Sequence, residues 1–432
     1  MTRMKDSGIE WIGEVPEEWG ITKIKFTTQL NGRIGWQGLT SAEYKEEGPY
    51  LITGTDFLDG KINFETAVHI DEKRWFEAKQ IQVENGDLLI TKDGTVGKVA
   101  IIEGLNEKAS LNSGVLRIQT TENISRRFLF YVLKSDVFWL WFNYTNSGAS
   151  TILHLYQNVF DEFSFTFPNV SEQTQIADFL DKKVDQLDKV KSLLEEQIKT
   201  LEDYRQSLIY ETVTKGLDKT VPLKDSGVDW IGQIPEGWGL SRLKAISSIE
   251  RGASPRPIDK YIAEDGVNWI RIGDAKKGSK YIYSTKLKIT KLGSSLSKYI
   301  IPGTLILSNS MSFGQPYITS IFGCIHDGWL SITPKNNVLK EYLYWTLLSE
   351  VCLSQFKYLS IGAVVENLSV DKVGNTVILL PSLSEQKQIA NFLDKKTEQI
   401  DQMISIKKEQ IENINKQRQT LIYDYVTGKR RV

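Results

Sequence analysis

Apolar residues recur every seven positions in two segments of the chain, and Lys, Glu and Gln fill most positions between them. This 3.5-residue spacing is typical of helices that pair along a coiled-coil seam. The two segments are residues 171–214 and 384–427. At about 1.5 Å per residue, a helix over either segment spans roughly 65 Å, which is enough to hold two domains at a fixed separation. The alternative is that each helix packs only on its own domain. The predicted seam residues are Leu187, Leu194, Leu201, Leu208, Ile400, Ile404, Ile411, Ile414 and Leu421.

The two helical segments are copies of one another. Residues 171–214 recur at 384–427 with 24 of 44 positions identical, and residues 6–20, DSGIEWIGEVPEEWG, recur at 225–239 with 10 of 15 identical. We call 6–20 and 225–239 the straps; their tryptophans favour a packing role, because indole rings offer contact area and little chemistry. The chain is therefore a duplication, and each half is a variable globular domain followed by a repeated helix.

The variable domains carry short β-type runs such as DLLIT at 87–91 and TLILS at 304–308, in the same order in both halves. Each domain then has one aromatic run, at 128–142 or 341–356, which is typical of a core helix more than of a base-stacking platform. The predicted fold class is α+β. The predicted organisation is a first domain with its strap at 1–170, a central helix at 171–216, a second domain with its strap at 217–383 and a C-terminal helix at 384–432.

Catalytic and metal-binding patterns are missing from the sequence. It has no GxxxxGK[ST] phosphate loop, no GxGxxG and no GxSxG, and its three histidines lack the spacing of metal ligands. Two cysteines make neither a disulfide framework nor a thiolate zinc cage. We therefore expect no metal, no cofactor and no catalysis in this chain. No apolar run approaches the roughly 20 residues of a membrane helix, and no secretory signal opens the chain, so we expect a cytoplasmic protein.

Charge is informative only locally, because the formal net charge is −1. Segment 251–300 holds eleven basic and four acidic residues, whereas 21–120 holds twelve basic and fourteen acidic residues. The excess in the second domain suggests contacts with phosphates. A lysine-rich solvated face is the alternative.

The doubled strap DSG-[IV]-[ED]-WIG-x-[VI]-P-x-x-W and the doubled SEQ-x-QIA-x-FLD-KK resemble the specificity subunit of type I restriction-modification systems, over essentially the whole chain. The resemblance implies two target recognition domains, each reading one half of a split DNA sequence, spaced by an antiparallel coiled coil. It implies no catalysis in this chain. It also implies two methyltransferase (modification) subunits that dock on the chain and carry S-adenosylmethionine, with motor-nuclease (restriction) subunits joining for cleavage.

Candidate DNA-contacting residues follow from the groups that read base edges in the major groove, namely Arg, Lys, Asn, Gln and small hydroxyls. We place them on the loop after the DLLIT-type strand and on early loops of each domain, where the two halves differ most. For any single one, a solvated loop residue is the alternative. The candidates are Arg33, Trp36, Gln37, Lys92, Asp93, Thr95, Lys98, Arg251, Ser254, Arg256, Arg271, Lys276, Lys277, Asn309, Ser310, Ser312 and Gln315.

Two other functions stay open on the residues alone. One is a coiled-coil scaffold that joins two protein- or glycan-binding domains. The other is an enzyme with an unrecognised site, such as a nuclease.

Overall fold

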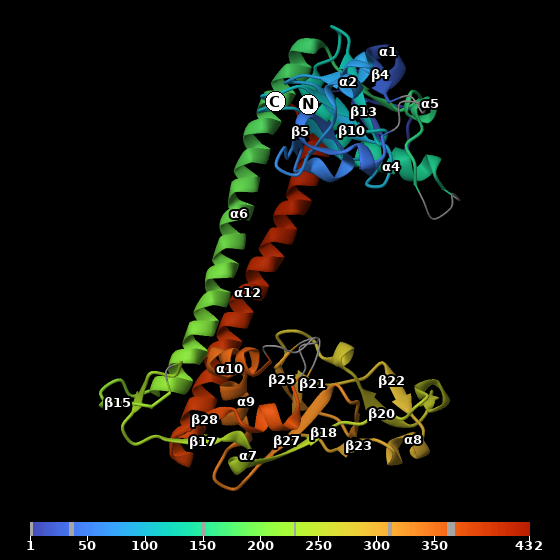
Figure 1. Cartoon of the computed structure of the whole chain (residues 1–432). Helices are drawn as coiled ribbons and strands as arrows, with labels where there is room; N and C mark the ends of the chain where they lie inside the picture. The colour runs from blue at the N-terminus through green and yellow to red at the C-terminus, as the bar shows by residue number, and fades with distance from the viewer. Residues whose placement is uncertain (1–2, 34–38, 148–152, 229, 310–312, 361–367) are drawn as a thin grey trace. The chain divides into compact units, whose positions relative to one another are not determined.

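The computed structural model describes residues 3–33, 39–147, 153–228, 230–309, 313–360 and 368–432 (Figure 1). The chain forms two compact units. Unit 1 comprises Met1–Leu194 and Glu409–Val432, and unit 2 comprises Glu195–Lys408. Each unit therefore holds one globular domain and one end of each long helix.

The domain of unit 1 is built on two four-stranded sheets. The first is antiparallel throughout, and its strands in spatial order are β11 (Val99–Ile101), β10 (Leu88–Thr91), β13 (Val115–Thr120) and β4 (Thr28–Gly32). The second contains one parallel pair, β5–β12, and its order is β8 (Val68–His69), β5 (Lys45–Ile52), β12 (Ala109–Leu111) and β9 (Gln82–Val83).

The domain of unit 2 repeats this plan with five strands in each sheet. The first sheet runs β18 (Ser247–Arg251), β27 (Trp329–Pro334), β24 (Leu305–Ser308), β25 (Pro316–Thr319) and β21 (Tyr281–Ile282). The second runs β19 (Ile262–Ala263), β22 (Leu287–Ile289), β20 (Val267–Ile270), β26 (Gly323–Ile325) and β23 (Lys298–Ile300).

The aromatic runs form core helices, as predicted. They fold as α3 (Arg126–Lys134) and α4 (Asp136–Thr145) in unit 1, and as α9 (Lys340–Leu348) and α10 (Glu350–Ser360) in unit 2. Phe128, Phe138 and Phe142 are buried in one core cluster with Leu88 and Ile90 of β10. These rings are therefore unavailable for stacking on bases.

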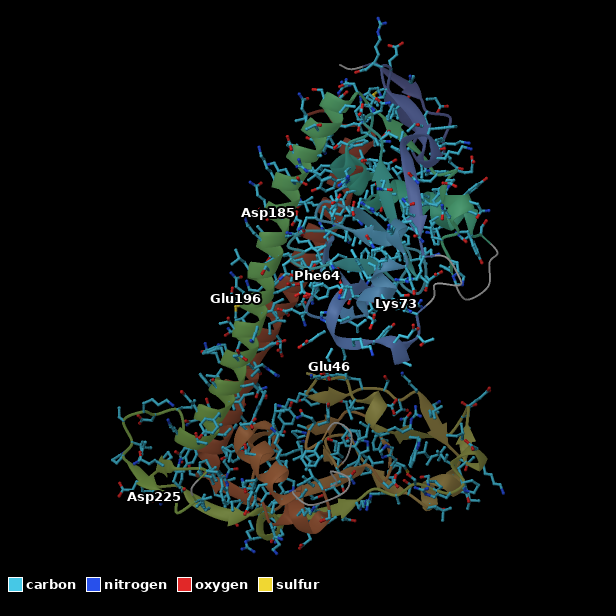
Figure 2. All side chains as sticks on the ribbon, turned by 45° about the horizontal axis from the view of Figure 1, so that its top comes forward. Glu46, Phe64, Lys73, Asp185, Glu196 and Asp225 are labelled. Carbon is cyan, nitrogen blue, oxygen red and sulfur yellow. The ribbon has the colours of Figure 1, made fainter. Side chains whose placement is uncertain are left out.

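The long helices α6 (Val170–Lys215) and α12 (Leu383–Val426) pair side by side within each unit (Figure 1). The pairing is antiparallel. In unit 1, Phe179 contacts Tyr425 and Asp188 contacts Arg418, so a position further along α6 contacts an earlier position of α12. All nine predicted seam residues are buried or half-buried, and this confirms the coiled coil. The outer side of α6 carries exposed charges such as Asp185 and Glu196 (Figure 2).

An ion pair across the seam occurs once in each unit. Arg205 Nε lies 3.6 Å from Asp401 Oδ1 in unit 2, and Arg418 Nη2 lies 3.4 Å from Asp188 Oδ2 in unit 1. Arg418 stands 213 positions after Arg205, and Asp401 stands 213 positions after Asp188. The pairs are thus copies with the two helices exchanged. Polar groups at core positions of a coiled coil fix its register, so the duplication fixes the same register at both ends.

The repeated SEQ motif connects each helix to its own domain. Gln173 Oε1 accepts a bond from Ser125 N before α3 (2.7 Å), and Gln386 Oε1 accepts one from Leu339 N before α9 (2.8 Å). The motif's glutamate accepts from the strap, because Trp19 Nε1 donates to Glu172 Oε2 (3.0 Å) in unit 1. Trp238 Nε1 donates to Glu385 Oε1 (3.2 Å) in unit 2. The strongly repeated residues therefore serve structure.

The N-caps of both long helices stand just ahead of the repeated SEQ motif. Glu172 N donates to Asn169 Oδ1 (3.0 Å) and Glu385 N donates to Ser382 Oγ (3.3 Å), so Asn169 and Ser382 cap α6 and α12. Ser171 and Ser384 already lie inside the helices and are not the caps. Each helix begins one residue before the serine of its SEQ motif.

Candidate nucleic-acid interface

The loops after β10 and β24 share one backbone scaffold. Thr91 N donates to Lys98 O (2.9 Å), and Ser308 N donates to Gln315 O (3.0 Å). The hydroxyl that ends each strand accepts from the far side of its loop, since Lys98 N bonds Thr91 Oγ1 (2.9 Å) and Gln315 N bonds Ser308 Oγ (3.0 Å). The same closure therefore holds both loops, although the side chains between differ.

The first residue of each loop is tied down in the same way. Lys92 N donates to Gly114 O (2.8 Å) and its carbonyl accepts from Leu155 N (2.9 Å). Asn309 N donates to Gly328 O (2.9 Å) and its carbonyl accepts from Leu368 N (2.9 Å). The backbone N–H and C=O of this residue are therefore bonded within the domain in both halves, and only its side chain differs between them.

A glycine near the end of each loop completes the scaffold. Gly97 and Gly314 have φ values of +83° and +72°, in the region that favours glycine. A Cβ atom on Gly97 would lie 2.7 Å from the Trp139 ring, and one on Gly314 would lie 2.7 Å from the Phe356 ring. Both the positive φ and the neighbouring aromatic ring therefore exclude a residue larger than glycine at these positions.

The first domain presents four candidate side chains on this loop. Asp93 Oδ1 lies 2.6 Å from His154 Nδ1, and both side chains are partly exposed. Thr95 Oγ1 donates to Gly54 O (3.3 Å), and the exposed Lys98 reaches the same carbonyl with Nζ at 3.5 Å. Lys92 is half-buried.

Arg33 has a different role from the one we predicted. It is only 5% exposed, and it donates from Nε to Leu111 O (2.9 Å) and from Nη2 to Ser110 Oγ (3.3 Å). Burial lowers the pKa of Arg33 to about 10, which still leaves the guanidinium charged at neutral pH. Because these bonds join β12 to the chain after β4, Arg33 supports the domain from within.

In the second domain, four candidates converge on Asp327. Ser254 Oγ donates to Asp327 Oδ1 (2.6 Å) and Arg256 Nη2 donates to Asp327 Oδ2 (3.3 Å). The backbone carbonyl of the same aspartate accepts from Arg251 Nε (3.0 Å) and from the buried Asn309 Nδ2 (2.8 Å). The structure therefore brings together residues separated by more than fifty positions in the sequence.

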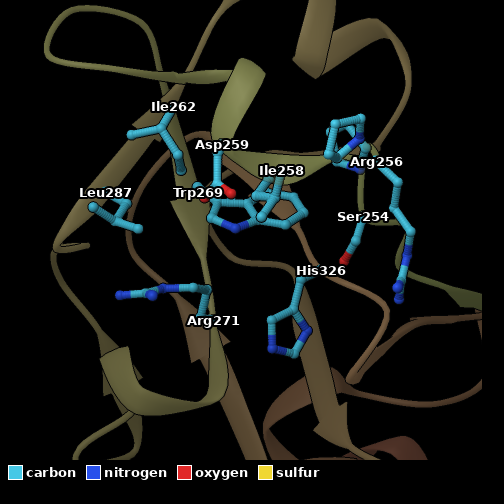
Figure 3. A pocket seen from close by; sticks show the side chains of 11 residues that line it. Ser254, Arg256, Ile258, Asp259, Ile262, Trp269, Arg271, Leu287 and His326 are labelled. Atoms are coloured by element: carbon cyan, nitrogen blue, oxygen red, sulfur yellow. The ribbon is translucent and has the colours of Figure 1, made fainter.

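A pocket of about 820 Å³ opens beside this cluster. Figure 3 shows Arg271 on one side of His326 and the Ser254–Arg256 segment on the other. His326 Nδ1 accepts a bond from Gly328 N (2.7 Å), and burial lowers the pKa of His326, so the ring is neutral at neutral pH. The lining residues are Ser254, Pro255, Arg256, Pro257, Ile258, Asp259, Ile262, Trp269, Arg271, Leu287 and His326.

Part of the basic excess of segment 251–300 is engaged inside unit 2. Lys280 Nζ lies 2.5 Å from Asp394 Oδ1 on α12, and Lys298 Nζ lies 2.5 Å from Glu250 Oε2. Arg271 Nε lies 3.9 Å from Asp274 Oδ2. Lys276 and Lys277 are exposed, and Gln315 is half-buried at the end of its loop.

Four candidates, Trp36, Gln37, Ser310 and Ser312, lie outside the described residues. Sequence reasoning missed His154, His326 and Asp327 as members of these clusters. The available signal was divergence, because Asn112 and Ser113 of the first half correspond to His326 and Asp327 of the second.

The described ranges contain neither a metal-binding cluster nor a membrane-spanning helix. There, no group of three or more His, Cys, Asp or Glu side chains is placed to hold a metal ion. Within the same part of the chain, no helix is both long and apolar enough to cross a membrane.

The same scaffold presents different polar side chains in the two domains. This arrangement is typical of a protein with two distinct recognition surfaces. The sequence matches the family model "Type I restriction modification DNA specificity domain" over residues 38–202 and 235–416. These spans cover most of the chain, which therefore belongs to this family.

Similar proteins agree with this assignment. The type I restriction enzyme MjaVIII specificity subunit of Methanocaldococcus jannaschii is 25% identical over 97% of this chain and 94% of its own length. A chain in a structure of complex assembly and conformational transition of the type I R-M system has a TM-score of 0.75 at 18% identity, covering 96% of this chain and 99% of that one. The HsdS subunit from Thermoanaerobacter tengcongensis gives 0.53 at 17% identity, covering 96% and 98%.

Proposed function

We propose that this chain is the DNA-recognition subunit of a type I restriction-modification complex and that each globular domain reads one half of a bipartite target through the major groove. The observation that carries the proposal is the pair of identically closed loops after β10 and β24, whose side chains differ. A fixed backbone with variable Lys, Asp, Asn and Gln side chains is suited to reading two different half-sites. The chain itself supplies recognition, and catalysis belongs to other subunits.

The docking of two modification subunits, one on each half, is supported by a tryptophan–tyrosine pair that the duplication has retained, with the tyrosine exposed in both halves. Trp11 and Tyr144 have ring centroids 5.2 Å apart in unit 1, and Trp230 and Tyr358 have centroids 6.2 Å apart in unit 2. The tyrosines are 64% and 68% exposed.

Packing does not account for the retained tyrosines. Nearby positions on the same helices have diverged, such as Phe138 to Cys352, which are both buried. An exposed ring that survives while core residues change favours contact with a partner that is the same at both places. A pocket of about 520 Å³ beside Trp230 and Tyr358 offers room for an apolar side chain of that partner.

The remaining parts of the complex follow from this assignment. S-adenosylmethionine would be bound by the modification subunits, and restriction subunits would join them for cleavage. Phosphate contacts from those subunits would offset the near-neutral charge of this chain, since such contacts dominate non-specific affinity. The complex would act in the cytoplasm. A protein- or glycan-binding scaffold is not favoured, because the family is one of DNA specificity domains.

The test is to map adenine methylation by single-molecule sequencing in a host that expresses this chain with its modification subunit. A host with the modification subunit alone is the control. We expect a split motif that appears only with this chain. Absence of any motif, with the modification subunit shown to be active with another specificity chain, would overturn the proposal.

A further inference from the structure

The carboxylate of Asp327 has no counterpart in the first domain. The equivalent position, 214 residues earlier, is Ser113, whose hydroxyl bonds only locally, to Asn112 Oδ1 (3.0 Å). Asp327 instead receives Ser254 and Arg256 on its two carboxylate oxygens, from a segment more than seventy residues away. This cluster is thus specific to the second domain.

The carboxylate is ionised at neutral pH. The hydrogen bond from Ser254 is the main reason that the pKa of Asp327 is lowered, and the nearby Arg256 acts in the same direction. A charged acceptor gives a stronger bond to a guanidinium than a neutral one, so Asp327 restricts the directions that Arg256 can take.

Arg256 is an exposed group of this cluster that can reach a ligand. Its side chain is 81% exposed although one terminal nitrogen is bonded to Asp327. A guanidinium has five N–H donors in a planar fork, so the donors that do not face Asp327 can bond a second acceptor. Arg251 and Ser254 also donate to Asp327, Arg251 to its backbone carbonyl and Ser254 to its carboxylate.

We propose that Asp327 is a positioning residue that orients Arg256 to read a guanine in the half-site of the second domain. Guanine presents two acceptors, O6 and N7, in the major groove, and arginine pairs with both at once. This inference rests on the proposed function and adds the base, the reading residue and the residue that orients it. The first domain, with Ser113 in place of Asp327, reads its half-site by other groups.

The experiment uses the full chain with its modification subunit and a library of DNA targets randomised in the second half-site. Methylation of each target is measured for the wild type, Asp327→Asn and Arg256→Ala. Asp265→Asn is the matched control, because Asp265 is a fully exposed carboxylate of the same domain that lies outside the cluster.

We expect both variants to lose preference for guanine at one and the same position, by roughly ten- to hundred-fold, while the first half-site stays unchanged. Asp265→Asn should behave like the wild type. Relaxation with Asp327→Asn but not with Arg256→Ala would overturn the inference, because Asp327 would then read a base itself. An equal loss of methylation on all targets would also overturn it, since that outcome reports a structural role.

The wild type and the variants together distinguish a failure of this inference from a failure of the proposed function. If the wild type gives a split motif and the variants leave it unchanged, only the inference fails. If the wild type gives no motif with an active modification subunit, the proposed function itself fails.

Discussion

Single residues explain why some positions of the duplicated chain repeat and others do not. Gln386 is 1% exposed, and its amide nitrogen donates to Pro381 O (3.0 Å) and Asn337 O (3.1 Å) while its oxygen accepts from Leu339 N. Gln173 makes the matching bonds in unit 1, to Pro168 O (2.8 Å) and Asn123 O (3.2 Å). Only a glutamine has the length and both kinds of group for this site.

Replacing Gln386 by Ala should therefore destabilise unit 2. The change leaves a buried N–H and two carbonyls without their partner, and we expect the free energy of unfolding to fall by roughly 2–4 kcal/mol. Urea unfolding followed by circular dichroism measures it. Gln388→Ala, two residues further along the same helix and exposed, is the control and should cost little. Equal effects of the two changes would contradict this role for Gln386.

The half-exposed aspartates of the repeated motif also have a structural explanation. Asp394 accepts bonds from Trp345 Nε1 (2.9 Å) and Lys280 Nζ (2.5 Å), and its counterpart Asp181 accepts from Tyr131 Oη (2.6 Å). The residue type on α3 or α9 has changed, but a donor remains opposite each aspartate. The aspartates of the helices thus connect the helices to their domains.

At the scale of elements, the helices are the part that the sequence predicts best. A seven-residue apolar period needs no information from elsewhere in the chain, and the seam residues lie where it places them. The caps are harder to predict, because Asn169 and Ser382 stand just ahead of the repeated SEQ motif, where the halves no longer match. Arg33 was misassigned because an arginine in a loop near a strand end can face inward or outward, and only tertiary packing decides.

The exposed tyrosines near the C-terminal ends of α4 and α10 lead to a prediction about the modification subunits. Tyr358→Ala should remove one of two modification subunits, because the Trp230–Tyr358 pair would lose one ring while the Trp11–Tyr144 pair stays intact. Native mass spectrometry of the assembled complex counts the subunits. Tyr299→Ala changes an exposed tyrosine of β23 in the same unit and serves as control. Retention of both modification subunits by Tyr358→Ala would contradict the docking site.

For the whole molecule, the duplication was visible in the sequence and Ser254 and Arg256 were predicted, but their meeting with Asp327 was not. Asp327, Ser254 and Arg256 meet through the packing of a turn after β26 on the segment after β18, and no spacing in the sequence encodes that meeting. The loops after β10 and β24 were identified because they differ between halves on a repeated frame. Asp327 also differs from its counterpart Ser113, but that difference alone does not identify the residues that contact Asp327.

The most direct test of the central claim, that two independent readers share one frame, is a domain exchange. Residues 24–163 lie between the paired strands β3 (Gly20–Lys23) and β14 (Ser164–Phe167), so a relative's domain can replace them while both strands, the first strap and the helices stay. Adenine-methylation mapping of the chimaera with its modification subunit should show one new half-site and one unchanged half-site. A change in both half-sites would contradict the account.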